Sequence, residues 1–161
     1  MSAESLRSVL AEGDRLLLDT SVVAAFFDTR DANHGLASHL LEELVAPGRN
    51  PAVVSMVVVM ELLVRPMRTV PQGHHTVLGF LRTFPNIDCL PVDLQVAQEA
   101  AHLRAASRFS TPDALIVGTG LAAQVRHLVT NDRDWVPRLA PMRGRIGVVL
   151  ASDHLPFPAR T

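Results

Sequence analysis

Four carboxylates placed beside predicted strand ends are the residues of this sequence that could do chemistry. Asp19 follows a strand-like run of leucines, and Asp132 follows another apolar run late in the chain. Glu61 lies in an otherwise apolar helical segment, and Asp113 lies at a predicted helix start. If the strands are parallel, all four meet at the carboxyl edge of one sheet, where α/β proteins place their sites. An oxygen-only set of this kind suits Mg²⁺ or Mn²⁺ and not zinc.

Each acid also has a structural explanation when it is taken alone. Asp19 is a preferred residue type for a helix N-cap. Asp113 follows a proline, and that pair is typical of the first turn of a helix. Asp132 lies in a sequence that could simply form a turn. None of the three decides between structure and function by itself.

Glu61 is the most informative of the four. Burying an unpaired carboxylate costs several kcal/mol, so this residue needs a partner. One candidate is Arg65, which lies four residues later on the same helix face. A metal ion is the interpretation that we favour, because several carboxylates at one sheet edge repel one another unless cations share them.

Apolar runs of strand length alternate with longer helical patterns along the chain. Continuous apolar strands are typical of a parallel sheet covered on both faces, so we expect a three-layer α/β/α sandwich. Gly118 and Gly120 would permit close packing of the helix that carries Asp113. The predicted strands are 15–18, 52–55, 87–92, 127–130 and 146–150, and the predicted helices include 35–46, 76–84, 94–107 and 113–124.

Composition limits the function classes. The chain has 161 residues, 48% of them hydrophobic, which indicates one folded domain. All 15 basic residues are arginines, which excludes lysine nucleophiles, Schiff bases and P-loop chemistry. Cys89 is the single cysteine, which excludes a disulfide framework and a thiolate zinc site. The net charge of -1 gives no global signature of a nucleic-acid binder.

We expect a cytoplasmic protein without membrane association. Residues 1–14, an N-terminal extension that is either a short helix or frayed, carry charges where a signal peptide would be apolar. The longest apolar run, 52–64, is too short to span a bilayer. The remaining residues, 15–161, would form the single domain.

With these motifs in order, the sequence resembles the PIN-domain ribonucleases, and in particular the VapC-type toxins of bacterial toxin–antitoxin pairs. The order and spacing hold from about residue 15 to 150. The first motif is weak alone, whereas the last two in succession are more specific. The matching stretches are Leu17-Leu18-Asp19-Thr20-Ser21, the apolar helix with Glu61, Thr111-Pro112-Asp113-Ala114-Leu115-Ile116, and Thr130-Asn131-Asp132-Arg133-Asp134-Trp135.

The resemblance implies a sheet with strand order 3-2-1-4-5 and an Mg²⁺- or Mn²⁺-dependent endoribonuclease. It also implies an RNA substrate, a VapB-type antitoxin whose arm covers the acidic pocket, and a toxin homodimer. Asp19, Glu61, Asp113 and Asp132 would be the catalytic, metal-binding acids. Thr20, Ser21, Thr130 and Asn131 would support them by hydrogen bonds, and Asp134 stands near an acid position whose role stays open.

Two other functions are alternatives to a metal-dependent ribonuclease. A PIN-fold RNA-binding or regulatory module without catalysis is disfavoured because all four acids are retained. An Mg²⁺-dependent phosphotransfer domain is disfavoured because Ser21 stands where a dehalogenase-like hydrolase has a second aspartate, and a receiver domain would need a lysine. Trp135 is most simply a packing residue, although base stacking is an alternative. Arg65, Arg68, Arg104, Arg108 and Arg133 are candidates for gripping phosphates, and the sequence leaves the choice open.

Overall fold

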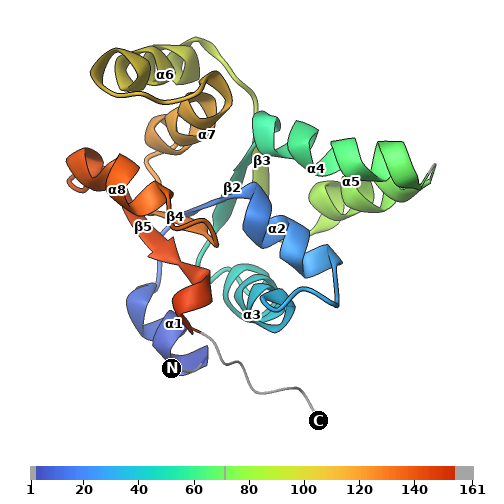
Figure 1. Ribbon diagram of the computed structural model, residues 1–161. Helices are drawn as coiled ribbons and strands as arrows, with labels where there is room; N and C mark the ends of the chain where they lie inside the picture. The colour runs from blue at the N-terminus through green and yellow to red at the C-terminus, as the bar shows by residue number, and fades with distance from the viewer. Residues whose placement is uncertain (1–2, 71, 155–161) are drawn as a thin grey trace.

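Five parallel strands form the centre of the molecule. The computed structural model of the chain describes residues 3–70 and 72–154. The strands pair in the order β3-β2-β1-β4-β5, which confirms the predicted fold class and strand order (Figure 1). All four pairings are parallel. The strands are β1 (Leu16–Leu18), β2 (Ala52–Ser55), β3 (Ile87–Leu90), β4 (His127–Thr130) and β5 (Gly147–Leu150).

Helices cover the sheet on both sides. Figure 1 shows α6 and α7 side by side, α2 and α3 on the other side of the sheet, and α4 with α5 projecting as an arm. The predicted helices are all present, with ends shifted by a few residues. The helices are α1 (Ala3–Val9), α2 (Thr20–Phe27), α3 (His34–His39) continued by the π-helical segment η1 (Leu40–Val45), α4 (Met56–Thr69), α5 (Gly73–Thr83), α6 (Leu94–Ala106), α7 (Thr111–Ala122) and α8 (Trp135–Leu139), with short 3₁₀ segments η2 (Ala140–Met142) and η3 (Ala151–His154).

Two glycines let α7 approach its neighbours closely. A Cβ at Gly118 would lie 2.9 Å from the carbonyl oxygen of Val96 on α6. A Cβ at Gly120 would lie 2.8 Å from a methyl group of Leu17 on β1. Both distances are shorter than carbon atoms tolerate, so the predicted close packing is confirmed. The packing fixes α7, and therefore the first turn that carries Asp113, against the sheet.

The long apolar run at 52–64 divides into β2 and the first part of α4. Ser55 marks the division, because its hydroxyl accepts a hydrogen bond from the backbone N–H of Val57 at 3.3 Å and so caps α4. Thr119 on α7 donates to the same buried hydroxyl at 3.0 Å. Within 3–70 and 72–154, no helix combines the length and apolar character needed to cross a bilayer.

The N-terminal extension is helical over α1 and packs into the same core as the sheet. Leu6 and Leu10 are both 0% exposed. Of the two alternatives for this segment, the helix is therefore correct, and a frayed end is wrong for the described part.

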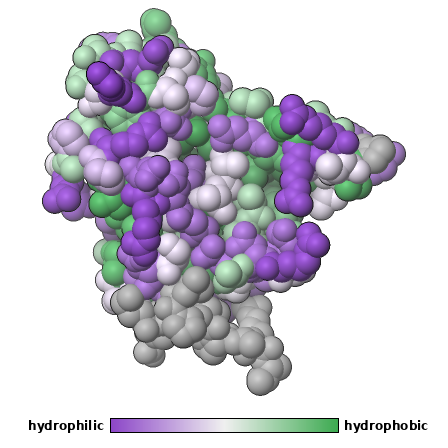
Figure 2. Space-filling view, viewed as in Figure 1, coloured by the Kyte–Doolittle hydropathy of each residue, from purple (hydrophilic) through white to green (hydrophobic). Residues whose placement is uncertain are grey.

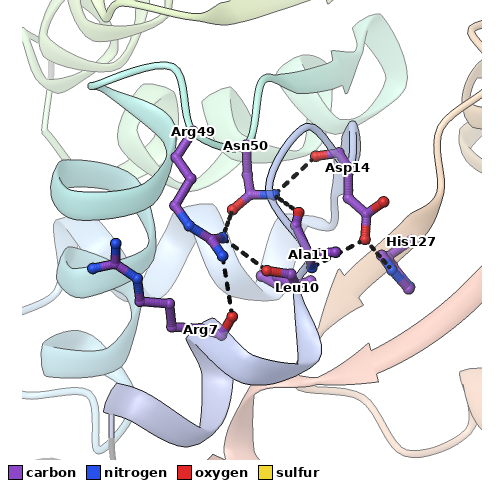
Figure 3. A network of polar contacts seen from close by, with 7 residues as sticks. All are labelled: Arg7, Leu10, Ala11, Asp14, Arg49, Asn50 and His127. Carbon is purple, nitrogen blue, oxygen red and sulfur yellow. Dashed lines mark hydrogen bonds and ion pairs between the residues drawn. The ribbon is translucent and has the colours of Figure 1, made fainter.

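A polar network, here called the N-terminal latch, joins the end of α1 to the amino edge of the sheet (Figure 3). The Arg49 guanidinium donates to the carbonyl oxygens of Leu10 at 2.7 Å and Arg7 at 3.3 Å. The Asn50 amide donates to the carbonyl oxygens of Ala11 at 2.7 Å and Asp14 at 3.1 Å. The Arg49 donors thus reach carbonyl groups at the end of α1, where a helix leaves such groups without intrahelical partners. The latch also includes His127, whose Nε2 lies 3.0 Å from Asp14 Oδ2.

Candidate active site

Asp19 lies at the carboxyl end of β1 and is 6% exposed. It occupies the N-cap position of α2, but its side chain makes no capping hydrogen bond. Instead, Asp19 Oδ2 accepts hydrogen bonds from the Ser21 hydroxyl at 2.9 Å and the Thr130 hydroxyl at 2.7 Å. Asp19 therefore takes the N-cap position that the sequence allowed, but its side chain does not cap the helix, and two of the predicted supporting residues contact it directly.

The same two hydroxyls hold the loop that follows β4. Ser21 Oγ accepts a hydrogen bond from the backbone N–H of Asn131 at 3.0 Å. Thr130 Oγ1 accepts one from the backbone N–H of Asp132 at 3.0 Å. Each hydroxyl thus donates to the Asp19 carboxylate and accepts from the loop. The orientation of Asp19 and the position of the loop are consequently coupled.

The negative charge of Asp19 has no cationic partner among the described residues, where no Arg or His forms an ion pair with it. Nearby, the buried Oδ1 atom of Asn131 has no hydrogen-bond partner. Its amide nitrogen donates to the carbonyl oxygen of Ser21 at 3.4 Å. Buried polar groups left open in this way are uncommon and call for a functional explanation.

Glu61 is half-buried in the second turn of α4, and one of its carboxylate oxygens accepts a hydrogen bond from the Thr20 hydroxyl. The alternative partner, Arg65, forms no ion pair with it in the part of the chain that the structure describes. Thr20 is the residue after Asp19. The hydroxyl therefore brings Glu61 next to the end of β1, as a supporting residue would.

Asp113 lies in the first turn of α7, and its backbone N–H donates to the Ser110 hydroxyl at 3.3 Å, so the predicted helix start is confirmed. Its carboxylate turns to a residue that sequence reasoning missed. Arg138 on α8 donates from Nη2 to Asp113 Oδ2 at 2.7 Å. The two residues are 25 positions apart, and no local pattern in the sequence predicts that they meet.

Asp132 and Asp134 are both exposed in the loop between β4 and α8. The backbone N–H of Asp134 donates to Asp132 Oδ1 at 2.9 Å, which is the side-chain turn that the sequence suggested. Asp134 precedes α8 and makes no capping hydrogen bond with its side chain. Its role stays open.

Thr20, the residue after Asp19, donates to Glu61, and the Thr130 hydroxyl joins Asp19 to the loop of Asp132, whereas Asp113 faces Arg138. Over the described residues, no three Asp, Glu, His or Cys side chains are grouped closely enough to hold one metal ion. The chemistry of the donors fits a hard cation, because all are carboxylate oxygens and Asp19 is buried without a counter-charge. The complete metal-ligand set stays a prediction.

A groove of about 440 Å³ opens beside Thr20 and Glu61 and runs between α2, α4 and α5 to Val77. In Figure 2, apolar and weakly polar atoms lie at the base of the projecting arm, with hydrophilic atoms on either side. Asp28 and Arg30 lie at the groove, and the backbone N–H and guanidinium of Arg30 hold the pKa of Asp28 below its usual range. The groove therefore has an apolar length and a charged end.

A family model described as the PIN domain matches residues 16–140. The chain belongs to the PIN domain family. The match spans all four candidate acids and Arg138, and it confirms the family expected from the sequence motifs. Among curated proteins, none matches the chain.

Solved structures of similar fold share little sequence with this PIN domain. A toxin–antitoxin complex from Klebsiella pneumoniae is 20% identical with a TM-score of 0.64, over 85% of this chain and 97% of that one. FitAcB from Neisseria gonorrhoeae is 18% identical with a TM-score of 0.64, over 88% and 99%. VapC20 of Mycobacterium tuberculosis, titled a sarcin-ricin loop cleaving toxin, is 20% identical with a TM-score of 0.58, over 75% and 92%. These similarities support the fold.

Trp135 and three of the five candidate arginines have defined surroundings in the structure. Trp135 is 3% exposed, so the packing interpretation holds and base stacking would require it to leave the core. Arg65 lines the groove beside Glu61. Arg133 pairs with Asp153, and Arg104 donates to the Thr111 hydroxyl at 2.9 Å.

Proposed function

We propose that this PIN domain is a metal-dependent endoribonuclease and the toxin of a VapBC-type toxin–antitoxin pair. The observation that carries the proposal is Asp19, a buried carboxylate at the carboxyl edge of the sheet that two hydroxyls orient and that no cationic side chain among the described residues neutralises. Support also comes from family membership and from similar folds that are described as a toxin–antitoxin complex and a sarcin-ricin loop cleaving toxin.

The chemistry assigned to the site needs no covalent intermediate on the protein. Asp19, Glu61, Asp113 and Asp132 would hold Mg²⁺ or Mn²⁺. Such an ion, when bound, activates a water molecule and neutralises charge on the scissile phosphate. The residues of the chain have a separate task, which is to keep the carboxylates in place. The hydroxyls of Ser21 and Thr130 orient Asp19, and that of Thr20 orients Glu61.

We assign the apolar groove to the antitoxin. Its walls include Phe27, Leu62 and Val77, and Glu61 lies at the end nearest the acids. A segment with apolar side chains and a terminal arginine would fill the groove and neutralise Glu61. It would thereby block the site, as expected for an antitoxin. VapBC2 from Rickettsia felis, another similar fold, is described as bound to a fragment of promoter DNA.

The homodimer and the cytoplasmic location implied by the resemblance also belong to this proposal. Sedimentation equilibrium of the purified chain measures its molar mass in solution and tests the dimer directly. A monomer at micromolar concentrations would contradict the dimer and leave the nuclease assignment untouched.

The deciding experiment is cleavage of cellular RNA by the purified chain with Mg²⁺ or Mn²⁺, with excess EDTA, and after Asp113→Asn. We expect discrete RNA fragments with either metal, none with EDTA, and none from the variant. Asp88→Asn is the matched control, because Asp88 lies on β3 with a side chain that is 66% exposed. Cleavage that survives EDTA or Asp113→Asn would contradict the proposal, and metal binding without cleavage would favour a non-catalytic module.

A further inference from the structure

The guanidinium of Arg138 lies over two neighbouring aromatic rings beside the candidate site. Its Cζ lies 4.7 Å from the ring centre of Phe109 and 4.8 Å from that of Trp135. The two rings are themselves 6.2 Å apart, centre to centre. An arginine side chain stacks on aromatic faces through both its charge and its planar shape.

Both rings belong to the hydrophobic core. Phe109 is 5% exposed and Trp135 is 3% exposed. Phe109 precedes α7 and Trp135 begins α8, so the stacking of Arg138 on both rings joins the two segments that carry Asp113 and Arg138. The core therefore fixes the position of the guanidinium, and a long, otherwise flexible side chain is held in place before any ligand binds.

The contact with Asp113 leaves half of the carboxylate open. Arg138 Nη2 reaches Oδ2 at 2.7 Å, and no hydrogen bond from the described residues reaches Oδ1. A different pair, Arg145 with Glu99, uses both carboxylate oxygens, at 3.0 and 2.8 Å. The two-oxygen pair engages both oxygens of Glu99, whereas the one-oxygen pair fixes the Asp113 carboxylate and leaves Oδ1 open to a ligand.

We propose that Arg138 is a positioning residue, held by Phe109 and Trp135, that orients the Asp113 carboxylate for a divalent metal ion. The proposal rests on the function proposed above. Partners that hydrogen-bond to a metal-binding carboxylate set its orientation, and their loss weakens metal binding by about 10- to 100-fold. Arg138 acts through Asp113 and is assigned no contact with the reacting atoms.

Calorimetric titration with Mn²⁺ tests the proposal without any assay of cleavage. Arg138→Met keeps an apolar stem against the two rings and removes every donor, and we expect about 10- to 100-fold weaker Mn²⁺ binding. Arg138→Lys keeps the charge and one donor, so it should recover part of the affinity. Arg145→Met is the matched control, because it removes an arginine–carboxylate pair at the opposite edge of the sheet.

A purely structural role for Arg138 would lower the melting temperature and leave the Mn²⁺ affinity unchanged. Equal affinity in Arg138→Met, Arg145→Met and the unmodified chain would therefore overturn the inference and leave the nuclease proposal standing. Should Arg138→Met not fold, the same comparison is made with Arg138→Lys, for which an unchanged affinity is again the contrary result. An unmodified chain that takes up no Mn²⁺ would overturn the proposed function and this inference with it.

Discussion

Buried polar groups at the two edges of the sheet differ in whether they have hydrogen-bond and charge partners. At the amino edge, the buried amide nitrogen of the N-terminal latch has hydrogen-bond partners: Asn50 is 0% exposed, and its amide nitrogen donates to two main-chain carbonyls. There, too, the carboxylate of Asp14 lies beside His127. At the carboxyl edge, Asp19 is buried with hydroxyl donors alone, and Asn131 Oδ1 has no partner.

The difference separates stability from function. A buried polar group with all its partners stabilises the fold, and one that lacks them destabilises it. Proteins tolerate such destabilisation mainly where a ligand will supply the missing partner. We therefore expect the latch to stabilise the domain and the carboxyl edge to bind the proposed cation. The predictions below test that division.

The largest effect is expected for Asp19→Asn, which should lower RNA cleavage by roughly 1000-fold or more. The amide can still accept the hydrogen bonds from Ser21 and Thr130, and it removes an uncompensated buried charge. The melting temperature should therefore stay equal or rise. Cleavage rates and thermal unfolding are measured on the same preparation, and a variant that loses both activity and stability would break the comparison.

In the latch, Asn50→Ala should destabilise the fold by about 2 to 3 kcal/mol, because it removes both hydrogen bonds that the buried amide nitrogen donates. That corresponds to a fall in melting temperature of roughly 5 to 10 °C for a chain of this size. Asn131→Ala is the counterpart at the other edge, where the amide donates a single long hydrogen bond of 3.4 Å. Urea unfolding should show a clearly smaller loss for Asn131→Ala, and equal losses would contradict the division.

Metal ions should stabilise only through the carboxyl edge. Mg²⁺ or Mn²⁺ at about 100 times its dissociation constant should add roughly 2.7 kcal/mol to the free energy of unfolding. The gain should persist in Asn50→Ala and disappear in Asp19→Asn. Thermal unfolding across a metal titration measures it, and the same gain in Asp19→Asn would place the ion elsewhere.

The smallest effect is a dependence of stability on pH, and it comes from the contact between Ser5 on α1 and His154. His154 is buried next to Ser5, with 2.8 Å between its Nδ1 and the serine hydroxyl, and burial lowers the pKa of the imidazole although neighbouring Asp153 opposes the shift. The unfolded chain therefore binds more protons than the folded one just below the ordinary histidine pKa of about 6.5. Stability should fall as pH drops from about 7.5 to about 5.5.

The control for that pH dependence is His154→Gln, which removes the titrating group. Its unfolding free energy should vary less over the same pH range than that of the unmodified chain. Identical pH profiles would mean that other groups cause the loss.

The sequence was a good guide to what depends on local patterns. Short apolar runs predicted all five strands, because a covered parallel sheet needs continuous apolar segments. The helix start at Asp113 was also readable, since proline and an acidic residue favour a first turn. The supporting roles of Ser21 and Thr130 came from the family resemblance, and the structure gives both hydroxyls to Asp19.

Contacts between distant residues were beyond sequence reasoning. The pairing of Arg138 with Asp113 depends on how α7 and α8 pack. Arg138 is therefore not among the arginines that the sequence offers as candidates for phosphate contact. The latch likewise joins Arg49 and Asn50 to carbonyl groups of α1 through folding alone. The Thr20 hydroxyl that meets Glu61 is also a contact between elements, which the rule for residues four apart on a helix, the basis of the Arg65 alternative, does not address.

The central claim is that carboxylates from four separate segments share a bound cation at the carboxyl edge. Crystals of the unmodified chain soaked in Mn²⁺ test it most directly, through the anomalous scattering of the metal. The account predicts a strong peak bounded by Asp19, Glu61, Asp113 and Asp132. A manganese peak at another place on the molecule, or none in crystals that leave this edge open to solvent, would contradict it.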